Sequence, residues 1–116
     1  MSQYNASDME MISVTIGATG KLSTVANAGG KRLAAIKMPA AWTAGTLTLY
    51  CSPTGTGSDG IQVIDGESGS AKTLTVTAGV WVEVPPEFGY SVRNVQLFSS
   101  VAQAEERTLN LYFREV

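Results

Sequence analysis

The chain has 116 residues, enough for one domain with a hydrophobic core, and 44% of them are apolar. Eight basic residues against ten acidic ones give a net charge of −2, which argues against nucleic-acid binding because such binding needs clustered positive charge. The sequence has no histidine, the commonest general base and metal ligand, and its single cysteine excludes an internal disulfide.

The N-terminal residues lack a basic stretch followed by an apolar run, and no segment approaches the roughly 18 apolar residues that span a bilayer. We therefore expect a soluble protein made in the cytoplasm, with no membrane partner. Residues 1–8 are expected to form a flexible N-terminal arm, and residues 9–116 a single domain.

Alternation of apolar and polar residues, interrupted by Gly and Pro, predicts β-strands along the whole domain. The expected strands are residues 10–16, 31–38, 46–52, 61–65, 72–77, 80–84, 92–100 and 107–116. A spacing of about 12 residues with turns between the strands favours two antiparallel sheets. The predicted fold is therefore all-β, an antiparallel β-sandwich of about eight strands in a jelly-roll-like arrangement.

The alternation also assigns most side chains to the inner or outer face. The last strand is expected to turn Leu109, Leu111 and Phe113 inward. Cys51 falls on the inward phase of its strand, as expected for a buried, unreactive thiol. Residues 92–100 fit either face, and residues 101–107 (VAQAEER) are the only stretch with helical composition.

A search for catalytic or metal-binding residues finds only three acidic candidates. Asp59, Asp65 and Glu67 stand in or beside Gly-rich turns, where two carboxylates could serve a glycosidase or several could hold calcium. Asp-Gly pairs also suit tight hairpin turns, and that role accounts for Asp59 and Asp65 without any chemistry. The spacing does not match a known calcium loop, so we expect neither a catalytic site nor a metal site.

Aromatic residues offer a second route to function. Trp81, Tyr112 and Tyr50 fall on the outward phase of their strands, and Trp42 lies in a connection after Pro39. Outward aromatic rings can pack under a loop, anchor a protein partner or stack on a sugar. We take the candidate interface residues to be Trp81, Tyr112, Tyr50, Arg93 and Trp42. For Trp42 the favoured role is closure of one end of the sandwich.

Four stretches carry a resemblance: LAAIKMPAAWTAGTLTLYCSPTG, VIDGESG, VTAGVWVEVPPEFGYSVRNVQLFSS and VAQAEERTLNLYF. They are similar to small β-sandwich proteins of tailed-bacteriophage structural gene clusters, which read approximately LPAAWTAA-x-L, then V-x-D-x-x-G, P-x-x-F and a terminal QAA-x-R-x-L-x-L. The resemblance covers residues 33–113. This chain departs from the pattern with MPAAW for LPAAW, a longer PTGTGSDG turn, and FGYSVRNVQL where the family tends to carry an arginine-rich strand.

The resemblance implies a structural component of the virion, associated with the head shell or the tail. We expect a non-enzymatic capsid decoration or cement protein that needs no cofactor, binds the major capsid protein or other virion proteins, and forms a homo-oligomer. Assembly is expected in the host cytoplasm. The alternative is a tail-fibre or carbohydrate-binding module for host attachment, which would use Trp81, Trp42 or Tyr112. A glycosidase acting through Asp59, Asp65 or Glu67 ranks third.

Overall fold

The computed structural model describes residues 9–89 and 92–115, so the arm expected at residues 1–8 lies outside the described part. Nearly all the regular structure in that part is strand. In chain order the elements are β1 (Glu10–Ile16), β2 (Ala26–Asn27), β3 (Arg32–Lys37), β4 (Leu47–Cys51), β5 (Ile61–Gln62), β6 (Thr73–Leu74), β7 (Trp81–Glu83), α1 (Pro86–Gly89), β8 (Asn94–Ser99) and β9 (Arg107–Arg114).

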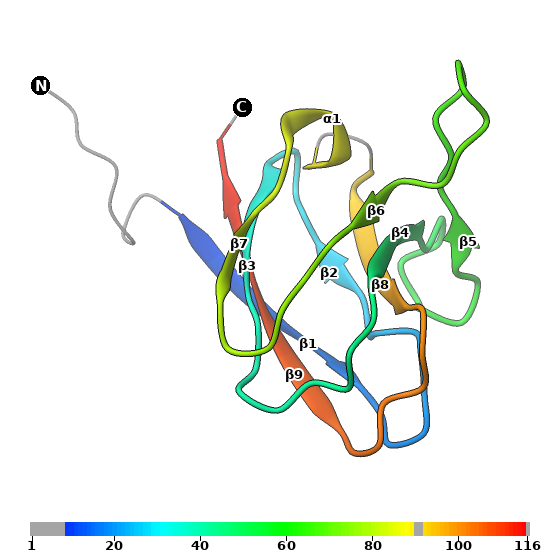
Figure 1. Cartoon of the computed structure of the whole chain (residues 1–116). Helices are drawn as coiled ribbons and strands as arrows, with labels where there is room; N and C mark the ends of the chain where they lie inside the picture. The colour runs from blue at the N-terminus through cyan, green and yellow to red at the C-terminus, as the bar shows by residue number, and fades with distance from the viewer. Residues whose placement is uncertain (1–8, 90–91, 116) are drawn as a thin grey trace, which may run out of the picture.

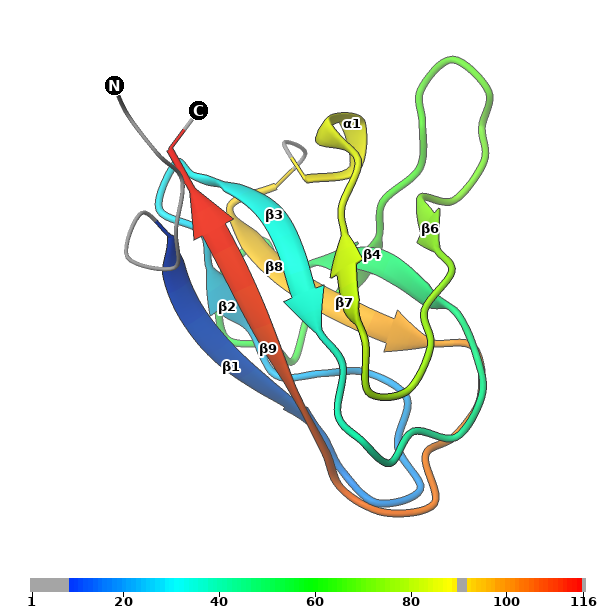
Figure 2. The same ribbon diagram turned by 60° about the vertical axis from the view of Figure 1, so that its left-hand side comes forward.

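The strands form two antiparallel sheets that pack face to face. The first sheet has the order β1-β9-β3-β7, and the second has the order β2-β8-β4-β5 with β6 also paired to β4. Figure 2 shows the first sheet in front, with β8 and β4 of the second sheet behind it. The all-β sandwich predicted from the alternation is confirmed.

The connections between strands make this sandwich a jelly roll. The chain crosses to the other sheet after β1, β2, β3, β6, β7 and β8, and stays in the second sheet from β4 to β6. β5 and β6 pair with opposite halves of β4, so together they act as one interrupted strand. Counting them as one gives two facing sheets of four strands, the arrangement of a jelly roll.

The core between the sheets is filled by the inward residues of the long strands. Leu109, Leu111 and Phe113 of β9 are fully buried, as predicted. They meet buried aliphatic side chains from the other strands, namely Val14, Ile16, Leu33, Ile36, Met38, Leu47, Leu49, Val95 and Leu97. The structure thereby settles the ambiguous strand, because Val95 and Leu97 face inward and Phe98 faces outward.

Some local details could not be read from the pattern. Residues 101–107 form no helix, as their short length indicated, and the backbone N–H of Gln103 donates to Gly20 O (3.0 Å) while its carbonyl accepts from Thr19 N (2.7 Å). The short helix is instead α1, where Pro86 occupies the first helical position that suits proline. Cys51 is half-buried rather than enclosed in the core.

The strands expected at 61–65 and 72–77 shrink to two residues each. The chain between β5 and β6 projects away from the sandwich as a long hairpin, which Figure 1 shows clearly. The strand β2 was not predicted, because two residues are too few for a periodic pattern. Within residues 9–89 and 92–115, no helix is long and apolar enough to cross a bilayer.

Candidate interaction face

The outer face of the first sheet carries an exposed aromatic pair. Trp81 of β7 and Tyr112 of β9 both point outward, on either side of β3, and their ring centroids lie 4.7 Å apart with the planes tilted by 43°. Ala35 of β3 is paired with Tyr112 and is only 2% exposed, so its short side chain lets the two rings meet above it. Trp81 nevertheless remains 47% exposed.

The apolar surface continues past Tyr112 onto the edge strand. Met11 of β1 lies directly opposite Tyr112 in the register and is 48% exposed. We call Met11, Tyr112 and Trp81 the aromatic stripe. It runs across all four strands of the first sheet, and a large apolar side chain exposed at each end makes it a candidate contact surface.

A hollow of about 290 Å³ opens on the same face, between Trp81 and the ends of β3 and β9. Its lining includes Arg32, Arg114, Glu83, Trp81, Ala34 and Ala35. The two alanines have short side chains that fill little space, and the pairing of β3 with β9 shifts register between Leu33 and Ala35. A register shift of this kind bends a strand and re-aims its side chains. We call this cavity the arginine hollow.

The charges in the arginine hollow are unusual for a sheet surface. Arg32 and Arg114 are direct partners in the β3–β9 register, and like charges placed directly opposite each other destabilise a sheet. Nη1 of Arg32 is buried and has no hydrogen-bond partner among the described residues. Glu10, at the start of β1, accepts from Lys31 Nζ at 2.9 Å and thereby raises the pKa of that lysine.

The second sheet carries a separate aromatic pair on its own outer face. Tyr50 of β4 stacks on Phe98 of β8, with ring centroids 4.8 Å apart and an interplanar angle of 11°. The ammonium of Lys21 lies 6.0 Å from the Phe98 centroid. Both aromatic rings are half-buried. Tyr50 therefore lies on the opposite side of the sandwich from Trp81 and Tyr112.

The other two candidate interface residues are also apart from the aromatic stripe. Trp42 is half-buried, packs against the core, and donates from Nε1 to Gly45 O at 3.4 Å. Its packing matches closure of an end of the sandwich. Arg93 is exposed in the approach to β8, where its carbonyl accepts from Ala28 N. The five predicted interface residues thus divide among several surfaces, and only Trp81 and Tyr112 are in contact.

The acidic candidates are occupied by turn structure. The Asp59 carboxylate accepts from Ser52 Oγ (2.5 Å) and Thr54 Oγ1 (2.7 Å), and these bonds hold its pKa below the ordinary value. Asp65 Oδ1 accepts from the Glu67 backbone N–H at 2.8 Å, as in a turn capped by aspartate. Residues 9–89 and 92–115 contain no cluster of three His, Cys, Asp or Glu side chains suited to a metal ion.

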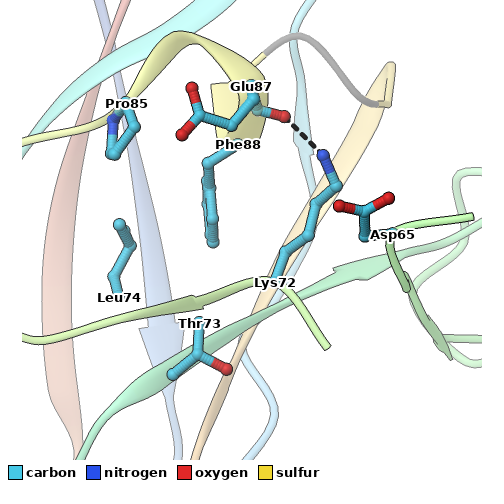
Figure 3. A pocket seen from close by; sticks show the side chains of 7 residues that line it. All are labelled: Asp65, Lys72, Thr73, Leu74, Pro85, Glu87 and Phe88. Carbon is cyan, nitrogen blue, oxygen red and sulfur yellow. Dashed lines mark hydrogen bonds between the residues drawn. The ribbon is translucent and has the colours of Figure 1, made fainter. Parts of the chain in front are cut away.

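A smaller cavity of about 160 Å³ lies between β6 and α1 (Figure 3). Lys72 points across it toward α1 and donates from Nζ to the carbonyl of Glu87, while Asp65 stands beside the lysine stem. Phe88 closes the other side and is 4% exposed. The lysine bond ties the projecting hairpin to α1, so this cavity is explained by local packing.

Sequence reasoning missed the arginine hollow. The alternation already turns Arg114 outward, and Arg32 precedes the inward Leu33, but nothing in the sequence says that β3 pairs with β9. Comparison with protein-family models, with curated proteins and with solved structures finds no match to this chain. The aromatic stripe and the arginine hollow are therefore the features from which a function has to be argued.

Proposed function

We propose that the chain is a non-enzymatic structural protein of a bacteriophage virion, a capsid decoration or cement protein that binds the head shell through the outer face of its first sheet. The observation that carries the proposal is the exposed Trp81 ring, packed on Tyr112 beside Arg32 and Arg114. Aromatic residues and arginine are the side chains that dominate binding energy at protein interfaces.

The virion assignment draws its support from two sources. Residues 33–113 resemble proteins of phage structural gene clusters. The jelly roll is an architecture that viral capsid proteins use, although lectins and other proteins use it too, so the fold agrees with the assignment without carrying it. The partner we propose is the major capsid protein or another shell protein, contacted by a homo-oligomer of this chain.

The proposal of a binding role rather than catalysis rests on how the chain uses its polar groups. The sequence has no histidine, and the Asp59 carboxylate is saturated with hydrogen bonds from its own loop. A carboxylate held in this way, with a lowered pKa, is a poor general acid because it stays ionised.

The test uses particles from an induced lysate of a strain whose genome carries the coding sequence. Mass spectrometry of virions purified on a density gradient should find the chain at a copy number comparable to that of the major capsid protein. Purified protein should also co-sediment with shells that lack it. Trp81→Ala should weaken this binding at least tenfold, while Ile61→Ala, at an even more exposed apolar position on the second sheet, should leave it unchanged. Absence from the particles would refute the assignment.

A carbohydrate-binding or tail-fibre module is the second candidate, and one observation favours it. The Trp81 ring stands at the wall of a hollow that also holds Glu83 and two arginines, a combination of stacking surface and hydrogen-bonding groups that suits a sugar. Host surface polysaccharide should then change tryptophan fluorescence, and Trp81→Ala should abolish the change. No response to polysaccharide, together with stoichiometric location in the head, would remove this candidate.

A further inference from the structure

We propose that the arginine hollow is a carboxylate-recognition site, which takes the side chain of a glutamate or aspartate from an extended segment of the partner protein while an apolar neighbour of that residue lies on the aromatic stripe. The inference deepens the proposed function by naming the chemistry of the partner. It rests on that function only in taking the partner to be a protein.

The size of the hollow suits one side chain rather than a large ligand. Its volume of about 290 Å³ lies at the lower limit of the range typical of small-molecule pockets. Ala34 and Ala35 are among the residues that line it, and their short side chains leave more room than larger ones would.

The arginine pair explains why the occupant should be a carboxylate. Arg32 and Arg114 face each other across β3 and β9 and so bring two positive charges to one place. A guanidinium presents parallel N–H donors that match the two oxygens of a carboxylate. The buried Nη1 of Arg32 has no acceptor among the described residues, and a buried donor without a partner is costly. A carboxylate in the hollow would accept from Nη1 of Arg32 and carry the charge opposite to that of the two guanidinium groups.

Glu83 and the aromatic stripe narrow the class of ligand that the hollow would bind. Glu83 lines the hollow and brings one negative charge, so a singly charged carboxylate suits the site better than a doubly charged phosphate. The adjoining surface is made of Met11, Tyr112 and Trp81, which favour an apolar residue next to the acid. An acidic residue flanked by apolar ones is therefore the expected recognition element, and an acidic sugar chain is the competing one.

The test is a titration of the full-length, ¹⁵N-labelled protein followed by NMR. The probe is N-acetyl-Leu-Glu-Leu-amide, and the matched control is N-acetyl-Leu-Gln-Leu-amide. We expect saturable shifts of the Trp81 indole and the Arg32 Nε–H signals with the glutamate peptide, and binding at least tenfold weaker with the glutamine peptide. Binding should weaken as salt is raised, because the contact is ionic. Equal binding of the two peptides, or no binding of either, would overturn the proposal.

Variants of the protein locate the site. Arg32→Gln should weaken binding of the glutamate peptide at least tenfold. Lys37→Gln makes the same change in charge on the same sheet face, opposite Trp81 in the register but outside the hollow, and should change binding less than twofold. Should Arg32→Gln fail to fold, Glu83→Gln remains informative, because loss of its negative charge should tighten carboxylate binding severalfold. Weaker or unchanged binding by Glu83→Gln would contradict the site.

Three further outcomes separate this inference from the proposed function. Binding of an oligogalacturonate in the hollow, with no response to the glutamate peptide, would reject a protein partner and support the carbohydrate alternative. Undiminished co-sedimentation of Arg32→Gln with shells would reject the carboxylate site while leaving the virion role intact. Binding of the glutamate peptide by a protein that is absent from virions would reject the virion role and support the carboxylate site.

Discussion

Gln103 holds together three loops at one end of the sandwich, and its replacement gives the sharpest test of the fold. The side chain is fully buried. Its Oε1 accepts from Thr43 N (2.9 Å) and Arg107 Nε (3.1 Å), and its Nε2 donates to Thr43 O (3.0 Å) and Ser99 Oγ (3.1 Å). The backbone of the same residue bonds to Gly20 and Thr19. The connections 39–46 and 100–106 therefore meet at the Gln103 side-chain amide, and the backbone of the same residue adds the connection 17–20.

Gln103→Leu keeps the volume and removes all four side-chain hydrogen bonds. Each is worth roughly 0.5–1.5 kcal/mol net, and the one from Arg107 somewhat more. Thr43 and Arg107 are only half-buried, so water can replace part of the loss. We expect the free energy of unfolding to fall by about 3 kcal/mol and the melting temperature to fall by roughly 12 °C, at about 4 °C per kcal/mol for a domain of this size.

The assay is urea unfolding followed by tryptophan fluorescence, which Trp42 in the 39–46 connection should report. Gln62→Leu, at an exposed position of β5, is the matched control and should change stability by less than about 0.5 kcal/mol. The slope of the unfolding free energy with urea should be the same in both variants. A Gln103→Leu protein within about 1 kcal/mol of the control would refute the idea that this amide holds the loops together.

Three further predictions concern other parts of the sandwich. A Cβ at Gly60 would lie 2.7 Å from Gln96 Oε1, and the Gln96 amide is already fixed by two hydrogen bonds. Gly60→Ala should therefore lower the free energy of unfolding, measured with urea, by about 2 kcal/mol. Gly66→Ala is the control and should lower it little, because a Cβ at Gly66 would have nothing within 4 Å. Folding lowers the pKa of the Asp59 carboxyl below its ordinary value of 3.8. The stability that this carboxylate contributes is therefore present above that value and is lost as the pH falls through the folded pKa. The melting temperature of the protein should drop on acidification below about pH 4, and it should drop less in the Asp59→Asn variant. A stability of Asp59→Asn with the same acid dependence as the parent would contradict this reasoning. Trp81→Ala removes an exposed ring and its contact with the Tyr112 ring, and should lower the free energy of unfolding by only about 1 kcal/mol. A much larger loss would mean that Trp81 belongs to the core rather than to a contact surface.

The periodicity of the sequence determined the class of fold and most of the long strands. A β-strand places alternate side chains on opposite faces, so the alternation around Leu109, Leu111 and Phe113 was sufficient to identify the buried side of β9. The same rule turned Trp81 and Tyr112 outward, as the structure has them. These features depend only on neighbours along the chain, which the sequence displays directly.

Tertiary structure decided everything that depends on which strands are neighbours. The sequence could not show that β3 pairs with both β9 and β7, and that pairing brings Arg32 to Arg114 and Trp81 to Tyr112. It could not settle the strand 92–100 either. Gln96 is on the outward phase, yet it is 1% exposed because the 53–60 loop covers it, and its amide bonds to Ser23 O and Gly57 O.

Residues 101–107, the only stretch with helical composition, show the same limit in a different form. Their composition favoured a helix, but Gln103 gains more by bonding to two other loops than by closing one helical turn, since the first turn of a helix is costly to form. The period of the apolar pattern and the composition of each stretch are local properties, so the sequence shows them directly. Three features depend on residues that are distant in sequence: the arginine hollow, the aromatic stripe and the hydrogen bonds of the Gln103 amide. Only the folded chain brings these residues together.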